Sequence, residues 1–236
     1  MKHLNQFITE YIVKKKLNKF VDSEHNYKYF PKTKKELIVN IQELFDTGEI
    51  NLNYIDTSNI KDMSDLFVEI SKARKVNFDV SGWDVSNVEK MDNMFNCCFK
   101  FDCDLSNWNV SKVKNMHSMF YACMEFEGKG LENWDVCNVE NMSYMFYHCK
   151  KFDGDLSNFD TSNVINMTYM FTNCLNFEGK GLDKWDVSNV KRMKGTFYCC
   201  KKFKGNGLEN WKLRSDCDTT DIFVDCDSLK NKPSWH

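Results

Sequence analysis

Residues 134–158 read WDVCNVENMSYMFYHCKKFDGDLSN, and variants of this stretch recur from about residue 55 to near the C-terminus. One slot of the pattern holds an aromatic residue at steps of 25 or 26, namely Trp83, Trp108, Trp134, Phe159, Trp185 and Trp211. A fixed period of this length is typical of stacked units that cannot bury their apolar faces alone. The sequence therefore predicts about seven stacked coils over residues 55–229.

Each repeat has two halves with different periodicity. Apolar residues from Val139 to Cys149 follow the spacing of one helical face. Asp135 and Asn138 precede this segment, and both residue types accept hydrogen bonds at helix N-termini. Ahead of them, Trp134 and Val136 share one face of a short extended segment. Each coil is thus expected to contain a strand and a helix, and successive strands would stack as a parallel ladder.

Stacking of such coils predicts buried columns of equivalent residues. One column contains Phe67, Phe95, Phe120, Phe146, Phe171, Phe197 and Phe223. Two methionine columns accompany it, with Met63, Met91, Met116, Met142, Met167 and Met193 in the first and Met94, Met119, Met145 and Met170 in the second. Stacked aromatic rings and adaptable thioethers fill a narrow core densely, so we interpret these residues as core rather than as a ligand site.

The pattern W-D-V-S-N-V-x2-M-x2-M-F-x2-C-x2-F, which covers roughly residues 52–229, resembles a known repeat family. It is similar to the 25–26-residue repeat of bacterial surface proteins and mycoplasma-type lipoproteins, among the BspA-like leucine-rich repeats. The resemblance implies an α/β solenoid of right-handed, leucine-rich-repeat-like β/α coils. It also implies binding to proteins or surfaces, a location at the cell surface, and no catalytic residues.

The ends of the chain depart from the repeat. Thr33 and Glu36 form a capping box ahead of an apolar stripe that begins at Leu37, and Gly48 is a stop signal. We therefore predict a helix–strand cap over residues 31–54, which covers the open end of the solenoid. Residues 230–236 are expected to form a C-terminal tail.

Residues 1–30 are predicted to form an amphipathic helix and a loop. Its apolar face contains Phe7, Ile8, Tyr11 and Ile12, which we identify as a candidate docking helix. A helix on a membrane surface and a disordered end are the alternatives. The apolar runs are too short for a secretory signal or a membrane span, so we expect a location in the cytoplasm or inside an assembly.

The composition narrows the function. The formal net charge is −2, which argues against a nucleic-acid partner because phosphate contacts need a basic stripe. No catalytic triad, phosphate-binding loop or metal motif is recognisable, so we expect neither catalysis nor a cofactor nor a metal.

Six of the 11 cysteines occupy one slot of the repeat: Cys98, Cys123, Cys149, Cys174, Cys200 and Cys226. Ile70 holds this slot in the first coil, so we interpret the slot as one for a medium-sized apolar group. We expect reduced core thiols in a cysteine ladder. A disulfide, a zinc site and a cysteine nucleophile are the less favoured alternatives.

Polar residues beside the tryptophan slot form a candidate interaction face. Its members are Asp84, Asn109, Asn133, Asp135, Asn158, Asp160, Lys184, Asp186 and Lys212. These side chains are expected to cap helices or bridge coils; a ligand face and calcium binding are the alternatives. The sequence predicts a non-catalytic scaffold for an unknown protein partner. The alternative is a structural or self-associating component docked through its N-terminal helix.

Overall fold

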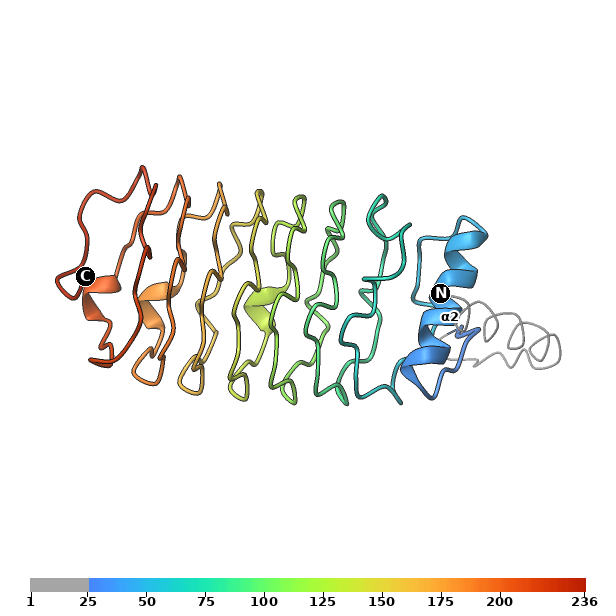
Figure 1. The fold of residues 1–236 in the computed structure, drawn as a ribbon. Coiled ribbons are helices and arrows are strands. Elements are labelled where there is room, and N and C mark those ends of the chain that lie inside the picture. Colours follow the sequence, from blue (N-terminus) through green and yellow to red (C-terminus); the bar gives the residue numbers. More distant parts are fainter. Residues whose placement is uncertain (1–25) are drawn as a thin grey trace.

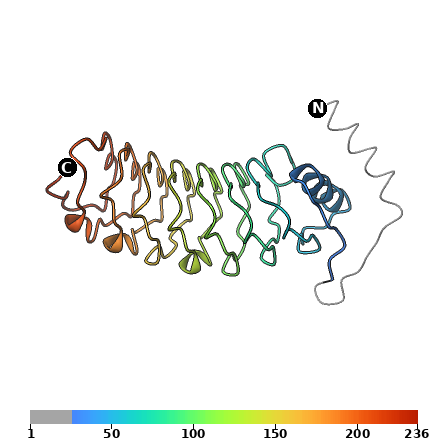
Figure 2. The same ribbon diagram turned by 90° about the horizontal axis from the view of Figure 1, so that it is seen from below.

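The computed structural model describes residues 26–236. Its coils lie side by side along one axis, with α2 at one end and the C-terminus at the other (Figures 1 and 2). Isolated parallel bridges join equivalent residues of successive coils: Asp62, Lys90, Asn115, Asn141, Asn166, Arg192 and Asp218. Their steps of 28, 25, 26, 25, 26 and 26 residues are the period of the repeat, so one repeat makes one coil.

The predicted fold class, a β/α solenoid with a parallel strand ladder, is wrong. Nowhere in residues 26–236 does the backbone form a strand, and α2 (Lys34–Asp46) is the one α-helix of that range. Residues 139–149, expected to be helical, form successive tight turns instead. Three short 3-10 segments occur in the coils: η1 (Leu131–Asn133), η2 (Leu182–Lys184) and η3 (Leu208–Asn210).

The hydrogen bonds explain why these segments are turns. Within one coil, the Met145 N–H donates to the Met142 carbonyl at 3.2 Å, which closes a turn of four residues. The Tyr144 N–H instead donates to Thr168 O of the next coil at 2.9 Å. An α-helix would direct each of these N–H groups to the carbonyl four residues earlier in its own segment. Here half of the donors are used between coils, so the helix cannot form.

Positive φ angles in the same turns also exclude a right-handed helix. The first left-handed column contains Asp65, Asn93, Ser118, Tyr144, Tyr169, Gly195 and Asp221, with φ from 53° to 59°. The second left-handed column contains Cys97, Ala122, His148, Asn173, Cys199 and Asp225, with φ from 56° to 61°. A left-handed non-glycine residue costs roughly 1–2 kcal/mol, so contacts between coils must offset this strain.

The predicted phenylalanine and methionine columns are buried, and they form the core. The rings of Phe120 and Phe146 stack with centroids 5.7 Å apart and planes 2° from parallel. A further phenylalanine column lies against it, and Phe126 of that column packs 4.3 Å from Phe120. The members of this further column are Phe78, Phe101, Phe126, Phe152, Phe177 and Phe203.

The tryptophan column is fixed by hydrogen bonds as well as by stacking. The Trp134 indole Nε1–H donates to Leu105 O of the preceding coil at 3.2 Å. The column continues beyond residue 229, because Trp235 stacks on Trp211 at 6.1 Å and donates to Leu208 O at 2.8 Å. The tail expected at residues 230–236 thus carries one more member of the column.

The N-terminal cap contains the predicted helix. Thr33 Oγ1 accepts a hydrogen bond from the Glu36 N–H at 3.3 Å, and α2 ends two residues before Gly48, whose φ is 88°. Leu37 and Phe45 are fully buried, and the Phe45 ring packs edge-on against Phe78 of the first coil with 5.6 Å between ring centroids. The predicted strand after this helix is absent from the structure: the segment at 50–54 has one isolated bridge, between Asn51 and Asp79.

The difference between 25- and 26-residue coils lies at a glycine. Gly130 has φ 91° and precedes η1, and its Cα lies so close to the coil before it that an added Cβ would be 2.2 Å from Ser106 N. Residues other than glycine rarely adopt this φ, and none would fit this space. The extra residue of the longer turn is therefore accommodated by a glycine that contacts the neighbouring backbone.

Candidate interaction surface

All nine residues of the predicted interaction face are exposed. They follow the coils along the molecule, and most are separated by the step of the repeat. Lys184, Asp186 and Lys212 are brought together around one shallow hollow of about 370 Å³. Two lysines and one carboxylate give this end of the face a mixed charge.

The carboxylates of this face shape turns. Asp135 Oδ1 accepts a hydrogen bond from the backbone N–H of Cys137 at 3.1 Å, and Asp84, Asp160 and Asp186 make the same bond two residues along. The helix-capping interpretation is wrong, since turns follow these residues. The bond is that of an Asx turn, in which the side chain replaces a backbone carbonyl.

Asparagine amides on this face and beside it form hydrogen bonds between neighbouring coils. Asn158 Nδ2 donates to Glu132 O of the preceding coil at 2.7 Å, as expected for this member of the face. A second set lies four residues after the tryptophan slot: Asn87, Asn138, Asn163 and Asn189 each donate to a carbonyl one coil away. Much of this face therefore has a structural role, which leaves fewer groups for a ligand.

The described part of the chain offers no set of ligands for the calcium site that was the alternative for this face. Among residues 26–236, no three His, Cys, Asp or Glu side chains are grouped so that they could hold a metal ion.

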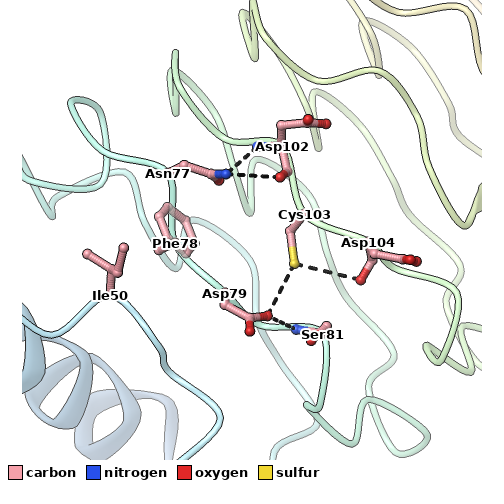
Figure 3. A pocket seen from close by; sticks show the side chains of 8 residues that line it. All are labelled: Ile50, Asn77, Phe78, Asp79, Ser81, Asp102, Cys103 and Asp104. Atoms are coloured by element: carbon pink, nitrogen blue, oxygen red, sulfur yellow. Dashed lines mark hydrogen bonds between the residues drawn. The ribbon is translucent and has the colours of Figure 1, made fainter.

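A pocket that the sequence did not indicate lies where the irregular first coil meets the second. Its volume is about 360 Å³, and Ile50, Phe78 and Cys103 line it together with several carboxylates (Figure 3). The Cys103 thiol donates to Asp79 Oδ1 at 3.5 Å, and the same oxygen accepts from the Ser81 N–H at 2.9 Å. Figure 3 shows that these groups point toward one another across the pocket.

The chemistry of Cys103 does not support a nucleophile. Burial, together with the nearby carboxylates of Asp79 and Asp104, raises the pKa of its thiol to about 12. The thiolate is the reactive form of cysteine, and a thiol with this pKa stays protonated at neutral pH. Cys103 therefore acts here as a hydrogen-bond donor.

The cysteine ladder has a structural role that the sequence interpretation missed. All 11 cysteines are free, and Cys149 Sγ donates to Phe120 O of the preceding coil at 2.9 Å. Cys123, Cys174, Cys200 and Cys226 make the equivalent bond. Burial raises the pKa of the Cys149 thiol, which keeps the donor proton in place. The slot was interpreted as simply apolar, and that interpretation is wrong in five coils.

Tyrosines form a surface cluster that we call the tyrosine face: Tyr121, Tyr144, Tyr147, Tyr169 and Tyr198, all half-buried. Tyr121 and Tyr147 stack with centroids 4.7 Å apart and planes at 12°. Tyr144 and Tyr169 lie 5.2 Å apart on adjacent coils. These tyrosines lie at variable positions of the repeat. Their recurrence at equivalent positions of several coils was the sequence signal that could have revealed the tyrosine face.

The candidate docking helix lies outside the described residues. Phe7, Ile8, Tyr11 and Ile12 are therefore still a prediction. Within residues 26–236, no helix has the length and the apolar character that crossing a membrane requires.

Comparison with known families gives one result that covers most of the chain. Residues 35–130 and 122–235 match the family described as Mycoplasma protein of unknown function, DUF285. The chain belongs to this family. The expected link to a mycoplasma-type repeat family is thereby confirmed. Comparison with curated proteins and with solved structures finds no match.

Proposed function

We propose that the protein is a non-catalytic protein–protein interaction scaffold, which presents the repetitive surface of its stacked coils to a protein partner. The observation that carries the proposal is the tyrosine face. Tyrosine is enriched at the buried centres of protein interfaces, where its ring provides a large contact area at a small cost in side-chain entropy. On this protein five such rings share one surface.

The rigidity of this surface also supports the proposal. Tyr144 and Tyr169 belong to the first left-handed column, where hydrogen bonds to the next coil fix the backbone. A surface that is ordered before binding loses less entropy when the partner docks. The similarity of the repeat to BspA-like proteins is in agreement with protein binding, and we propose that relation as the finer family assignment.

The proposal is tested by affinity capture with the full-length protein and two variants, read by mass spectrometry. The first variant carries Tyr147→Thr and Tyr198→Thr, because Thr172 occupies the equivalent position and the coil accepts threonine there. The second, a matched control, carries Asp135→Ser and Asp160→Ser on the predicted interaction face, which we call the polar face.

We expect a protein captured by the wild type to be retained by the polar-face control and to fall at least tenfold with the tyrosine variant. A partner that is lost only with the control would move the binding surface to the polar face. The scaffold proposal fails if the wild type captures no protein above a resin without ligand.

A further inference from the structure

The tyrosine face contains a gap in a column of rings. Tyr121, Tyr147, Thr172 and Tyr198 occupy equivalent positions of four successive coils. Thr172 is buried, and its hydroxyl donates to Gly195 O at 2.7 Å, so its short side chain turns into the molecule. The place of one aromatic ring between Tyr147 and Tyr198 is thus left open.

A second missing side chain opens the same region. The first left-handed column runs from Tyr169 through Gly195 to Asp221, and a Cβ on Gly195 would lie 2.3 Å from the ring of Tyr169. The Tyr169 ring therefore lies directly over Gly195, and any larger residue at position 195 would clash with it. The result is a pocket of about 370 Å³, lined by four tyrosines with Thr172, Asn173 and Asp221.

The spacing of the coils sets the width of the pocket. Tyr147 and Tyr198 are two coils apart, which corresponds to about 10 Å at the usual spacing of stacked backbone segments. A flat group in contact with rings on both sides needs about 7–8 Å, since carbon atoms pack at about 3.5–4 Å. The gap therefore accepts one planar group.

Two polar groups of the pocket, the Asp221 carboxylate and the Asn173 amide oxygen, are acceptors. Among the described residues that line the pocket, Asp221 is the one charged residue, and it is exposed. The half-buried Lys194 does not line the pocket. Asn173 Nδ2 lies 3.2 Å from His148 Nε2. Burial, aided by Lys150, lowers the pKa of His148, so a neutral ring nitrogen accepts from the amide. The Asn173 amide oxygen is then left as an acceptor.

We infer that this pocket binds the guanidinium of an arginine side chain supplied by a protein partner. The group is planar and cationic, stacks on aromatic faces, and carries donors that pair with a carboxylate. A neutral planar group would gain no attraction from the exposed Asp221 carboxylate, and an anion would be repelled by it. A lysine ammonium is compact and does not fill a flat gap. The inference rests on the proposed scaffold function and names the chemistry of its partner.

The test uses the full-length protein with N-acetylarginine methylamide as the probe, and follows the tyrosine ring signals by NMR. The neutral isostere N-acetylcitrulline methylamide has nearly the same shape. We expect saturable shifts with the arginine probe and at least fivefold weaker binding of the citrulline probe.

Three variants separate charge from shape. Asp221→Asn should weaken the arginine probe at least threefold, while Asp65→Asn, at the equivalent position of the first coil, should change nothing. Thr172→Tyr should abolish the saturable shifts by filling the gap. Three coils carry tyrosine at this position, so the fold accepts it, and an unchanged circular dichroism spectrum would verify this.

Equal binding of the two probes, an absence of saturable shifts, or equal effects of Asp65→Asn and Asp221→Asn would overturn the arginine assignment. The probe assay involves no partner protein, so such a result would leave the scaffold proposal intact. That proposal is judged separately by capture with the tyrosine variant.

Discussion

Replacing Cys149 by valine distinguishes a hydrogen-bonded thiol from a merely apolar one. The thiol is fully buried and donates to Phe120 O at 2.9 Å. Valine is of similar size and lacks the donor. If the slot needs only apolar volume, as Ile70 in the first coil suggested, Cys149→Val should be neutral.

The structure allows the loss to be calculated. Phe120 O also accepts from the Cys123 N–H at 2.9 Å, so Cys149→Val leaves no buried carbonyl without a partner. The cost is one net hydrogen bond, about 0.5–1 kcal/mol for a weak S–H donor. Cys149→Ala also loses roughly 1 kcal/mol of apolar burial and leaves a small cavity, so we expect about 2 kcal/mol.

Urea-induced unfolding under reducing conditions, followed by tryptophan fluorescence, measures these differences as shifts of the midpoint at constant slope. In thermal unfolding, each 1 kcal/mol lowers the Tm by about 2–4 °C for a chain of this size. Cys137→Ser is the matched control. Cys137 lies off the ladder, other coils carry serine at its position, and the change should be within about 0.5 kcal/mol.

A Cys149→Val variant as stable as the wild type, together with a destabilised Cys149→Ala variant, would refute a stabilising role of the thiol hydrogen bond. The slot would then be apolar, and the thiol–carbonyl contact would contribute nothing to stability. An equally large loss of unfolding free energy in Cys137→Ser and Cys149→Val would also refute this role, because the loss would then not depend on membership of the cysteine ladder.

Other predictions concern backbone space, the tryptophan column and pH. Gly130→Ala should lower the free energy of unfolding in urea by about 3 kcal/mol or more, because strain at positive φ adds to a clash with the neighbouring backbone. Gly48 has φ 88° and nothing within 4 Å of an added Cβ, so Gly48→Ala should lower it by only about 1 kcal/mol. Equal losses in the two variants would contradict the clash. Trp134→Phe should cost about 1–3 kcal/mol in the same assay through the lost indole donor and ring area, and a neutral result would mean that stacking alone holds the column. Hydrogen bonds from the Lys180 ammonium and from Ser157 lower the pKa of Asp155 from 3.8 to about 2, so this carboxylate stabilises the fold above pH 3.8 and loses that contribution as the pH falls toward 2. Asp155→Asn should therefore flatten the fall of Tm between pH 4 and pH 2, and an unchanged slope would show that the ion pair does not affect stability.

The sequence predicted the core better than the backbone. The columns through Phe146 and Met142 are buried as expected, because a repeat with a constant step must place equivalent residues above one another. The helix α2 was also predictable, since Thr33 and the apolar stripe are local signals. The helices expected inside the coils were wrong because apolar spacings of three and four residues fit successive turns as well as a helix.

The candidate sites show the same division. The exposure of Asp135 and its neighbours was predictable from their alternation with Trp134 and Val136. The tyrosine pocket was not predictable, because it depends on the short side chain of Thr172 and on the Tyr169 ring, which lies over Gly195. These residues belong to different columns and meet only in the folded coils.

By itself, the sequence determined the period, the identity of the core columns and the capped N-terminal end. These properties follow from residue type and spacing along one chain. Only the tertiary structure decided that each coil is a series of turns, because the choice depends on where backbone N–H groups find their acceptors. The acceptor of Tyr144 N–H is Thr168 O, one coil away. A partner that lies 24 residues further along the chain cannot be recognised from the local apolar pattern.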